Sequence, residues 1–164
     1  RRLIEAGFDA QDAMQTLNAL YILRGDGVFS TVDLVQVSLC TGEGYLHKWG
    51  AAPSYLRQGR GVQKIGTASP PPGLGVGETH EAWCAKLSLQ QKQTLVLVSD
   101  GVGETDVLDG LHTDAPLRTL AAGIVNRSHP GEADDRSTIL LRLRPVRPQH
   151  KHSTRAAHFL SKLR

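Results

Sequence analysis

One stretch of the chain decides the fold: Leu95-Val96-Leu97-Val98-Ser99-Asp100-Gly101-Val102-Gly103-Glu104. Its four consecutive apolar residues predict a strand buried on both faces, so Asp100 stands where the chain leaves the core. Gly101 permits a tight reversal and lets a ligand approach the backbone closely. A strand that ends in Asp-Gly is typical of a metal-binding carboxylate and equally of a plain turn. This segment alone leaves both interpretations open.

The composition is that of one globular domain. The 164 residues suffice for one core, and 40% hydrophobic and 21% charged residues are ordinary values for a soluble protein. Aromatic residues make up only 5%, so the chain lacks the row of stacking side chains that single-stranded nucleic acid binders use. We therefore expect no nucleic-acid partner.

Several features are typical of a cytoplasmic domain. Cys40 and Cys84 lie in apolar, strand-like runs without metal-type spacing, so we expect reduced core residues rather than a disulfide. No apolar run is long enough to span a bilayer, and no leader is recognisable. The chain begins at Arg1 instead of Met, which indicates a piece of a longer protein. Any membrane anchor of that parent would lie in an upstream segment.

Charge is unevenly spread along the chain. From Arg136 to the C-terminus there are eight Lys or Arg and no acid, whereas residues 1–135 carry 11 basic and 16 acidic residues, a net charge of −5. We divide the chain into a body at 1–144 and a basic tail at 145–164, with a short helix predicted from Arg155 to Leu163. Such a tail can attract an anionic partner, but a solvated extension is the simpler interpretation.

Hydrophobic periodicity predicts helices and strands along the body. Apolar residues at steps of three and four twice follow a good N-cap residue, Asp9 and Asp114, which predicts two amphipathic helices. Apolar runs between turn residues predict the strands. The predicted elements are the end of a helix at 1–7, helices at 10–23 and 116–127, and strands at 32–39, 45–49, 55–56, 62–65, 80–87, 93–98 and 139–143.

Turn residues suggest how these strands pair. The turns at 41–44 and 90–92 each predict a hairpin, and so an antiparallel, all-β core. Pro53 cannot donate to a ladder, so it marks an edge or a sharp bend. We expect an exposed loop at 69–75 and a polar, irregular segment between Glu104 and Asp114.

Two acidic turns are each joined to an apolar strand. Asp100 follows one strand, whereas Asp134 and Asp135 precede another. Antiparallel pairing of these strands would place the turns at the same edge of one sheet. Carboxylates with no His or Cys nearby favour magnesium or manganese over zinc. Paired acids at turns are also commonly just solvated, so the pattern alone does not decide for a metal site.

Four motifs in order carry a family resemblance. They are Ser30 to Leu34, Gly50 to Ser54, Leu97 to Val102 and Asp134 to Ser137. Together they resemble the C-terminal phosphatase domain of the stage II sporulation protein E family, which belongs to the PPM-type, or type 2C-like, serine/threonine phosphatases. The similarity runs from about Arg1 to Leu143 and leaves the basic tail outside.

The resemblance implies a fold and a site. The fold is α+β, an antiparallel β-sandwich flanked by helices. The family's metal-ligand aspartates fall on Asp100 and Asp134, with Gly101, Asp135 and Ser137 as supporting residues. The complete domain holds two manganese or magnesium ions. Asp33 and the Gly50 to Pro53 turn are matched as structural features.

The resemblance also implies an activity and partners. Members hydrolyse phosphoserine or phosphothreonine, and the substrate expected here is a phosphoprotein like a phosphorylated anti-anti-sigma factor. Residues 1–23 correspond to the family's regulatory helices, through which a homodimer is possible.

The chain departs from the family pattern at its start. The family's Asp-Gly-Met-Gly motif, an upstream acid and the first strands do not occur here, so we expect an incomplete sandwich and a fragment that is inactive alone. The alternative is a non-catalytic, phosphatase-like module for protein interaction. Its acidic turns would have no function, and the tail or the first helices would bind the partner.

Overall fold

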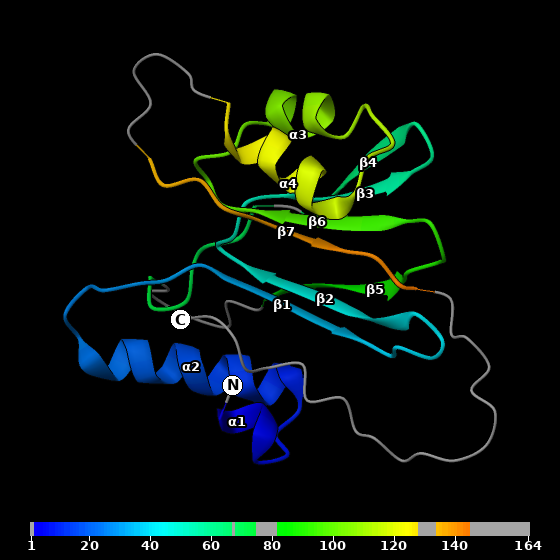
Figure 1. Ribbon diagram of the computed structural model, residues 1–164. Helices are drawn as coiled ribbons and strands as arrows, with labels where there is room; N and C mark the ends of the chain where they lie inside the picture. The colour runs from blue at the N-terminus through cyan, green and yellow to red at the C-terminus, as the bar shows by residue number, and fades with distance from the viewer. Residues whose placement is uncertain (1, 67, 75–81, 128–133, 145–164) are drawn as a thin grey trace.

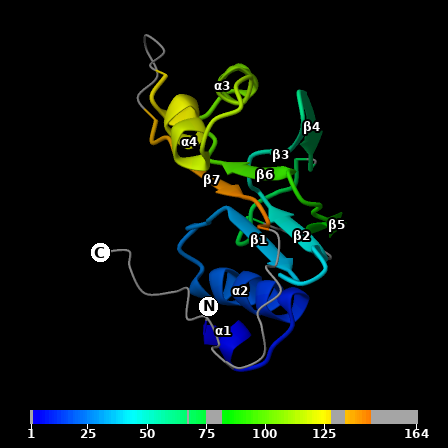
Figure 2. The same cartoon turned by 45° about the vertical axis from the view of Figure 1, so that its right-hand side comes forward.

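Two antiparallel sheets stack face to face, with helices on both outer sides (Figures 1 and 2). The structure is a computed structural model and describes residues 2–66, 68–74, 82–127 and 134–144. The predicted antiparallel β-sandwich flanked by helices is therefore confirmed. The elements are α1 (Arg2–Glu5), α2 (Ala10–Arg24), β1 (Val32–Val37), β2 (Glu43–Trp49), β3 (Ser54–Gln58), β4 (Gly61–Ile65), β5 (Trp83–Ser88), β6 (Thr94–Val98), α3 (Glu104–Gly110), α4 (Leu117–Val125) and β7 (Thr138–Leu141).

Helix α2 begins and ends as the sequence predicts. The Asp9 side chain accepts a hydrogen bond from the Asp12 backbone nitrogen at 2.8 Å, which satisfies a donor that the first helical turn leaves unpaired. Gly25 ends the helix in the left-handed conformation with a φ of 64°. The helix lies along the outer side of the first sheet (Figure 1).

The first sheet has the order β1-β2-β5 and the second the order β4-β3-β6-β7. The predicted hairpin of β1 and β2 is confirmed, with Val32 opposite Trp49. The chain passes from the first sheet to the second between Trp49 and Ser54. Pro53 lies at this crossing, so the sharp bend predicted there is also confirmed.

The predicted hairpin of β5 and β6 is wrong. β5 pairs with β2 in the first sheet, whereas β6 pairs with β3 and β7 in the second. Leu89 explains the difference, because its side chain is buried and its backbone nitrogen donates to the Gly42 carbonyl at 2.9 Å instead of to β6. The turn at 90–92 thus joins two layers of the sandwich.

The segment after Glu104 differs from the prediction. Residues 104–110 form α3, whose acidic first turn suits the helix dipole. Asp114 does not cap α4, because the cap position is Pro116, with extended backbone at φ −55° and ψ 146°. Proline disfavours helical backbone in the residue before it, so the helix starts two residues later than a cap at Asp114 requires.

Two hydrophobic clusters hold the layers together. One lies between the sheets, around the buried residues Leu87, Leu89 and Leu95. The other joins the second sheet to α3 and α4. Its buried members are Tyr55, Val96, Val98, Val102, Val107, Leu111, Leu120 and Ile124. The alternation along β6 thus supplies both clusters, one from each face of the strand.

Neither cysteine belongs to these clusters, which corrects the prediction. Cys40 and Cys84 are both free and exposed. Cys40 follows the end of β1, and Cys84 lies on β5, at the margin of the first sheet. An apolar run at a sheet margin exposes one of its faces, which the sequence pattern does not reveal.

Over the described ranges, no helix is long and apolar enough to cross a membrane. The short helix predicted from Arg155 to Leu163 lies outside the described residues.

We predict that Leu95→Ala lowers the free energy of unfolding by about 2–5 kcal/mol, because it leaves a cavity between the sheets. Leu95 is 0% exposed, whereas the control residue Leu39 is 70% exposed. Leu39→Ala should change the stability by no more than about 0.5 kcal/mol. Urea unfolding followed by circular dichroism measures both, and equal losses would contradict this assignment of the core.

Candidate metal-binding site at two acidic turns

The pairing of β6 with β7 brings the two acidic turns together. Val98 lies opposite Thr138 in this antiparallel pair. One residue further on, the Ser99 backbone nitrogen donates to the Ser137 carbonyl at 3.0 Å. The end of β6 and the start of β7 therefore meet at one edge of the sheet, as the sequence predicts.

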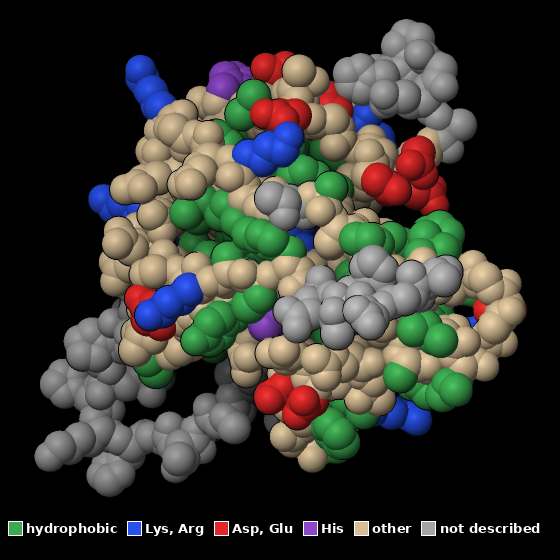
Figure 3. All heavy atoms as spheres, turned by 180° about the vertical axis from the view of Figure 1, so that it is seen from behind, with side chains coloured by type: hydrophobic (Ala, Val, Ile, Leu, Met, Phe, Trp, Pro, Cys, Tyr) green, Lys and Arg blue, Asp and Glu red, His purple; other side chains and the backbone are tan. Residues whose placement is uncertain are grey.

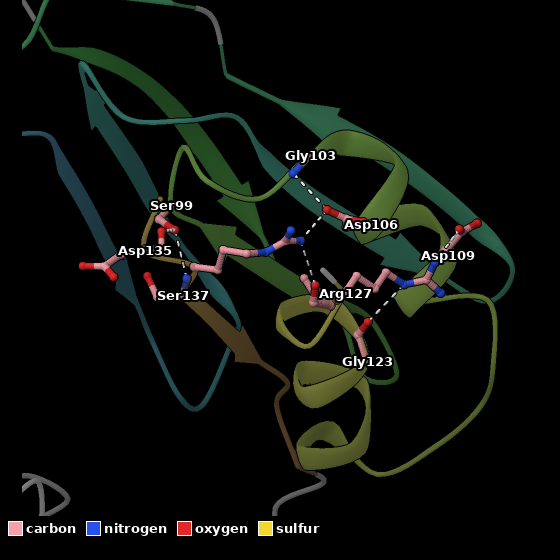
Figure 4. A network of polar contacts seen from close by, with 10 residues as sticks. Ser99, Gly103, Asp106, Asp109, Gly123, Arg127, Asp135 and Ser137 are labelled. Carbon is pink, nitrogen blue, oxygen red and sulfur yellow. Dashed lines mark hydrogen bonds and ion pairs between the residues drawn. The ribbon is translucent and has the colours of Figure 1, made fainter. Parts of the chain in front are cut away.

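Ser99 joins the turns a second time through its hydroxyl group (Figure 4). The hydroxyl donates to the Asp135 carbonyl at 3.1 Å and accepts from the Ser137 backbone nitrogen at 2.9 Å. These bonds hold the backbone on both sides of Arg136. Ser137 thus contributes its backbone to the contact between the turns.

Gly101 is needed because the second turn lies against it. A Cβ atom at this position would lie 2.7 Å from the Asp135 carbonyl oxygen and 3.3 Å from the Asp134 Cβ atom. The sequence predicts a close approach at Gly101, and the structure shows that the backbone of the other acidic turn makes it. The residues after Asp100 and those beside Asp134 are therefore in direct contact.

A buried ion pair ties both turns to α3. Arg136 pairs with Asp106, and their side chains are 13% and 2% exposed. The same Asp106 carboxylate accepts from the Gly103 backbone nitrogen at 3.3 Å, at the start of the helix (Figure 4). Asp106 therefore links the segment after Asp100 with the segment after Asp134.

The sequence alone does not reveal this pair. A signal was present, because Asp106 follows the helix-starting Gly103 by three residues, which is the spacing of a capping box. Nothing in the sequence shows, however, that Arg136 is the partner.

All four motifs that carry the resemblance surround one hollow. Its volume is about 250 Å³. It is lined by Thr31, Asp33, Ala51, Ala52, Leu97, Val98, Ser99, Asp100, Ser137, Thr138 and Ile139. The hollow lies at the acidic end of the sandwich, so segments that are far apart in the chain share one place.

Asp33 belongs to a polar network between the sheets. Lys48, whose side chain is 0% exposed, pairs with Asp33 and donates to the Ser54 hydroxyl at 2.8 Å. Burial raises the pKa of the Asp33 carboxyl, and the hydrogen bond and charge of Lys48 oppose this rise. These contacts agree with a structural role for Asp33.

The residues at the turns have the donor atoms that divalent cations prefer, but they form only part of a metal-binding site. Asp100, Asp134 and Asp135 are exposed and offer carboxylate oxygens, the donors that magnesium and manganese prefer. Among the described residues, no group of three or more His, Cys, Asp or Glu could hold a metal ion. A metal ion at these turns would take further ligands, such as water, beside these carboxylates.

Comparison with known sequences gives one family. The family model described as stage II sporulation protein E matches residues 1–148. Stage II sporulation protein E of Bacillus subtilis is 25% identical over 155 residues, which cover 85% of this chain and 18% of the relative. Its counterpart in Priestia megaterium is 29% identical over 105 residues, or 63% of this chain and 18% of the relative. The chain thus spans about a fifth of these relatives.

Comparison with solved structures supports the fold. A structure of the PP2C phosphatase domain and a regulatory fragment of the Bacillus subtilis protein has a TM-score of 0.70 at 22% identity, over 86% of this chain and 46% of that one. The manganese-presoaked phosphatase domain has a TM-score of 0.56 at 23% identity, over 93% and 71%. A structure of RsbX with magnesium reaches 0.63 at 12% identity, over 85% and 68%. The sandwich is that of the PPM phosphatases.

We predict that Asp106→Asn lowers the free energy of unfolding by about 3–5 kcal/mol, because it removes the buried carboxylate that pairs with Arg136 and accepts from Gly103. Asp109→Asn is the matched control on the same helix. Asp109 pairs with Arg127 at 2.7 Å, but both side chains are exposed, at 62% and 39%, so its loss should cost at most about 1 kcal/mol. Urea unfolding measures both variants, and equal effects would refute a special role for the buried pair.

Proposed function

Because the chain belongs to the stage II sporulation protein E family, we propose that it forms part of a metal-dependent phosphatase domain that dephosphorylates serine or threonine in a protein. The observation that carries the proposal is the contact between the turns of Asp100 and Asp134 at the hollow shared by the four motifs. Asp100 and Asp134 are the proposed metal ligands, with manganese or magnesium as the ions and two ions in the complete domain.

The chain's own residues position these carboxylates. Ser99 and the backbone around Ser137 hold the turns in register, and the Arg136–Asp106 pair fixes them against α3. Bound divalent ions in such a site would polarise phosphoryl oxygens and lower the pKa of a bound water. Rigid strand ends suit this task, because ligands placed on regular elements keep their geometry better than ligands on free loops.

The proposed substrate is a phosphoprotein of the anti-anti-sigma-factor type. This finer assignment rests on the family resemblance. Phosphate removal from a serine or threonine side chain requires that the segment carrying it reaches Asp100, which is exposed.

We predict that Asp100→Asn and Asp134→Asn each lower manganese-dependent phosphatase activity of the natural full-length protein. The loss should be at least about 10–100-fold, the range seen when only an outer-shell partner of a metal ligand is removed. Asp109→Asn is the control, because it removes the same charge from an exposed position at the other end of α3. Activity is measured as phosphate release from a phosphoserine protein.

Calorimetric titration with manganese adds a readout that does not depend on turnover. Both ligand variants should bind manganese more weakly than the wild type, and the control should bind it equally well. Full activity of Asp100→Asn would exclude Asp100 as a ligand. An inactive wild-type protein that binds no manganese would favour the non-catalytic interaction module.

We further propose that α1 and α2 mediate a homodimer. Exposed apolar side chains gather along the opening segment, namely Ile4, Phe8, Leu20, Ile22 and Leu23. A contact between two copies of the chain through α1 and α2 would bury these side chains, which favours association.

We predict that Leu23→Glu weakens this dimer about tenfold or more, because it places a charge at an 81% exposed apolar position of the interface. Leu39→Glu is the control, since Leu39 is 70% exposed but lies in the turn after β1. Light scattering over a range of protein concentrations measures the association. A monomeric wild type, or equal weakening by both variants, would refute the proposed interface.

A further inference from the structure

A second hollow lies at the end of the second sheet that is opposite to the acidic turns. Its volume is about 870 Å³, and the turns after β3 and before β6, the loop between α3 and α4, and the residues after β7 line it. β6 begins with Thr94 at this end and reaches Val98 at the acidic end, about 13 Å away at the usual rise per residue. The two hollows are therefore separate.

Basic side chains converge on this second hollow. Arg57, Arg60, Lys92, Arg142 and Arg144 line it, together with a single acid, Asp114. Arg57, Arg60 and Lys92 lie within residues 1–135, which carry a net charge of −5. In Figure 3 acidic side chains gather at the right-hand edge, whereas Lys and Arg side chains project from the left-hand edge, where this end of the sheet lies. We call this site the basic hollow.

Arg57 is the buried basic residue of the basic hollow. It is only 6% exposed, on the face of β3 that packs against the helices. Its Nε atom donates to the Gly59 carbonyl at 3.0 Å. Its Nη2 atom lies 3.8 Å from the Asp114 carboxylate, whose side chain is 95% exposed.

The charge of Arg57 is therefore poorly compensated within the part of the chain that the structure describes. Burying a guanidinium group costs free energy unless an anion and well-made hydrogen bonds offset the lost hydration. Arg142 is half-buried, and its Nε atom donates to the Thr94 hydroxyl at 2.9 Å. This bond engages one nitrogen and leaves the fork of the guanidinium to other partners. Both arginines thus suit an anion bound between them.

The rest of the lining indicates the kind of anion. Besides the charged residues, the basic hollow is lined mainly by glutamine side chains, with Leu143 as the apolar contact and His112 as the one ring among the described lining residues. Arginine forks match phosphate oxygens in pairs, whereas no Phe, Tyr or Trp lies among the described lining residues to stack on a nucleobase. The volume falls within the range of small-molecule sites.

We propose that the basic hollow binds a small ligand carrying two or more phosphate groups, which the convergent arginines recognise through their oxygens. This inference does not depend on the proposed phosphatase function, because it uses none of the residues at the acidic turns. Recognition of the phosphates alone predicts that inorganic pyrophosphate binds about as well as a nucleoside diphosphate.

The test is calorimetric titration of the full chain with pyrophosphate and with ADP, in a chelator and about 0.15 M salt to screen loose surface charge. We expect saturable binding of both ligands. Arg60→Glu and Arg144→Glu, at exposed positions of the lining, should each weaken binding about tenfold or more, the value of one lost charge-assisted contact. Arg57→Gln should do the same, and the two exposed variants keep the test valid if this buried one does not fold.

Two controls make the result specific. Arg118→Glu on α4 changes the charge equally at a position outside the lining, and Asp100→Asn alters the acidic turns. Both should bind pyrophosphate like the wild type. Absence of saturable binding, or equal weakening by Arg118→Glu, would overturn the proposal. So would tighter binding of an acidic hexapeptide than of pyrophosphate, which would assign the basic hollow to protein recognition.

Discussion

The antiparallel pairing of β6 with β7 is the contact on which the candidate site depends. It joins a strand that ends at Val98 to one that begins at Thr138, and the hydrogen bonds of Ser99 extend the pairing into the turns. The exposed carboxylates thus lie next to the ends of a strand pair whose residues Leu95 and Val96 are completely buried. Motions of exposed loops displace such a site less than they would displace a site on a free turn.

Two buried ion pairs flank the hollow at the acidic end. Asp33 and Lys48 lie between the sheets, and Asp106 and Arg136 lie between α3 and the second turn. Such pairs contribute little net stability, because the lost hydration of both charges offsets their attraction. They do, however, strongly disfavour arrangements in which either charge is left alone. We infer that they make the packing around the hollow specific more than they make it stable.

Much of the fold could be predicted from the sequence, because local patterns carry it. The Asp9 cap, the hairpin of β1 and β2 and the bend at Pro53 each depend on residues close together in the chain. The partner of β5 could not be predicted, since a short polar turn serves a hairpin and a crossing between sheets equally well. Helix α3 was missed because it is short and rich in acids, with Val107 as its fully buried apolar side chain.

The candidate site, like the fold, could be predicted only in part from the sequence. Asp100, Asp134 and their meeting at one sheet edge follow from strand polarity and from the resemblance. The Asp106–Arg136 pair and the basic hollow depend on contacts between distant segments, and no spacing in the sequence reveals these. The exposed cysteines were misjudged for a related reason, because the burial of an apolar run depends on its place in the sheet.

The fit between Gly101 and Asp135 also limits how this chain can evolve. The atom that faces Gly101 is a backbone carbonyl, and every amino acid has one. A larger residue at position 101 therefore cannot be accommodated by a smaller side chain at position 135, as a clash between two side chains often can. Compensation would require both turns to move together, and with them the two carboxylates. A substitution at Gly101 would therefore disturb both acidic turns at once.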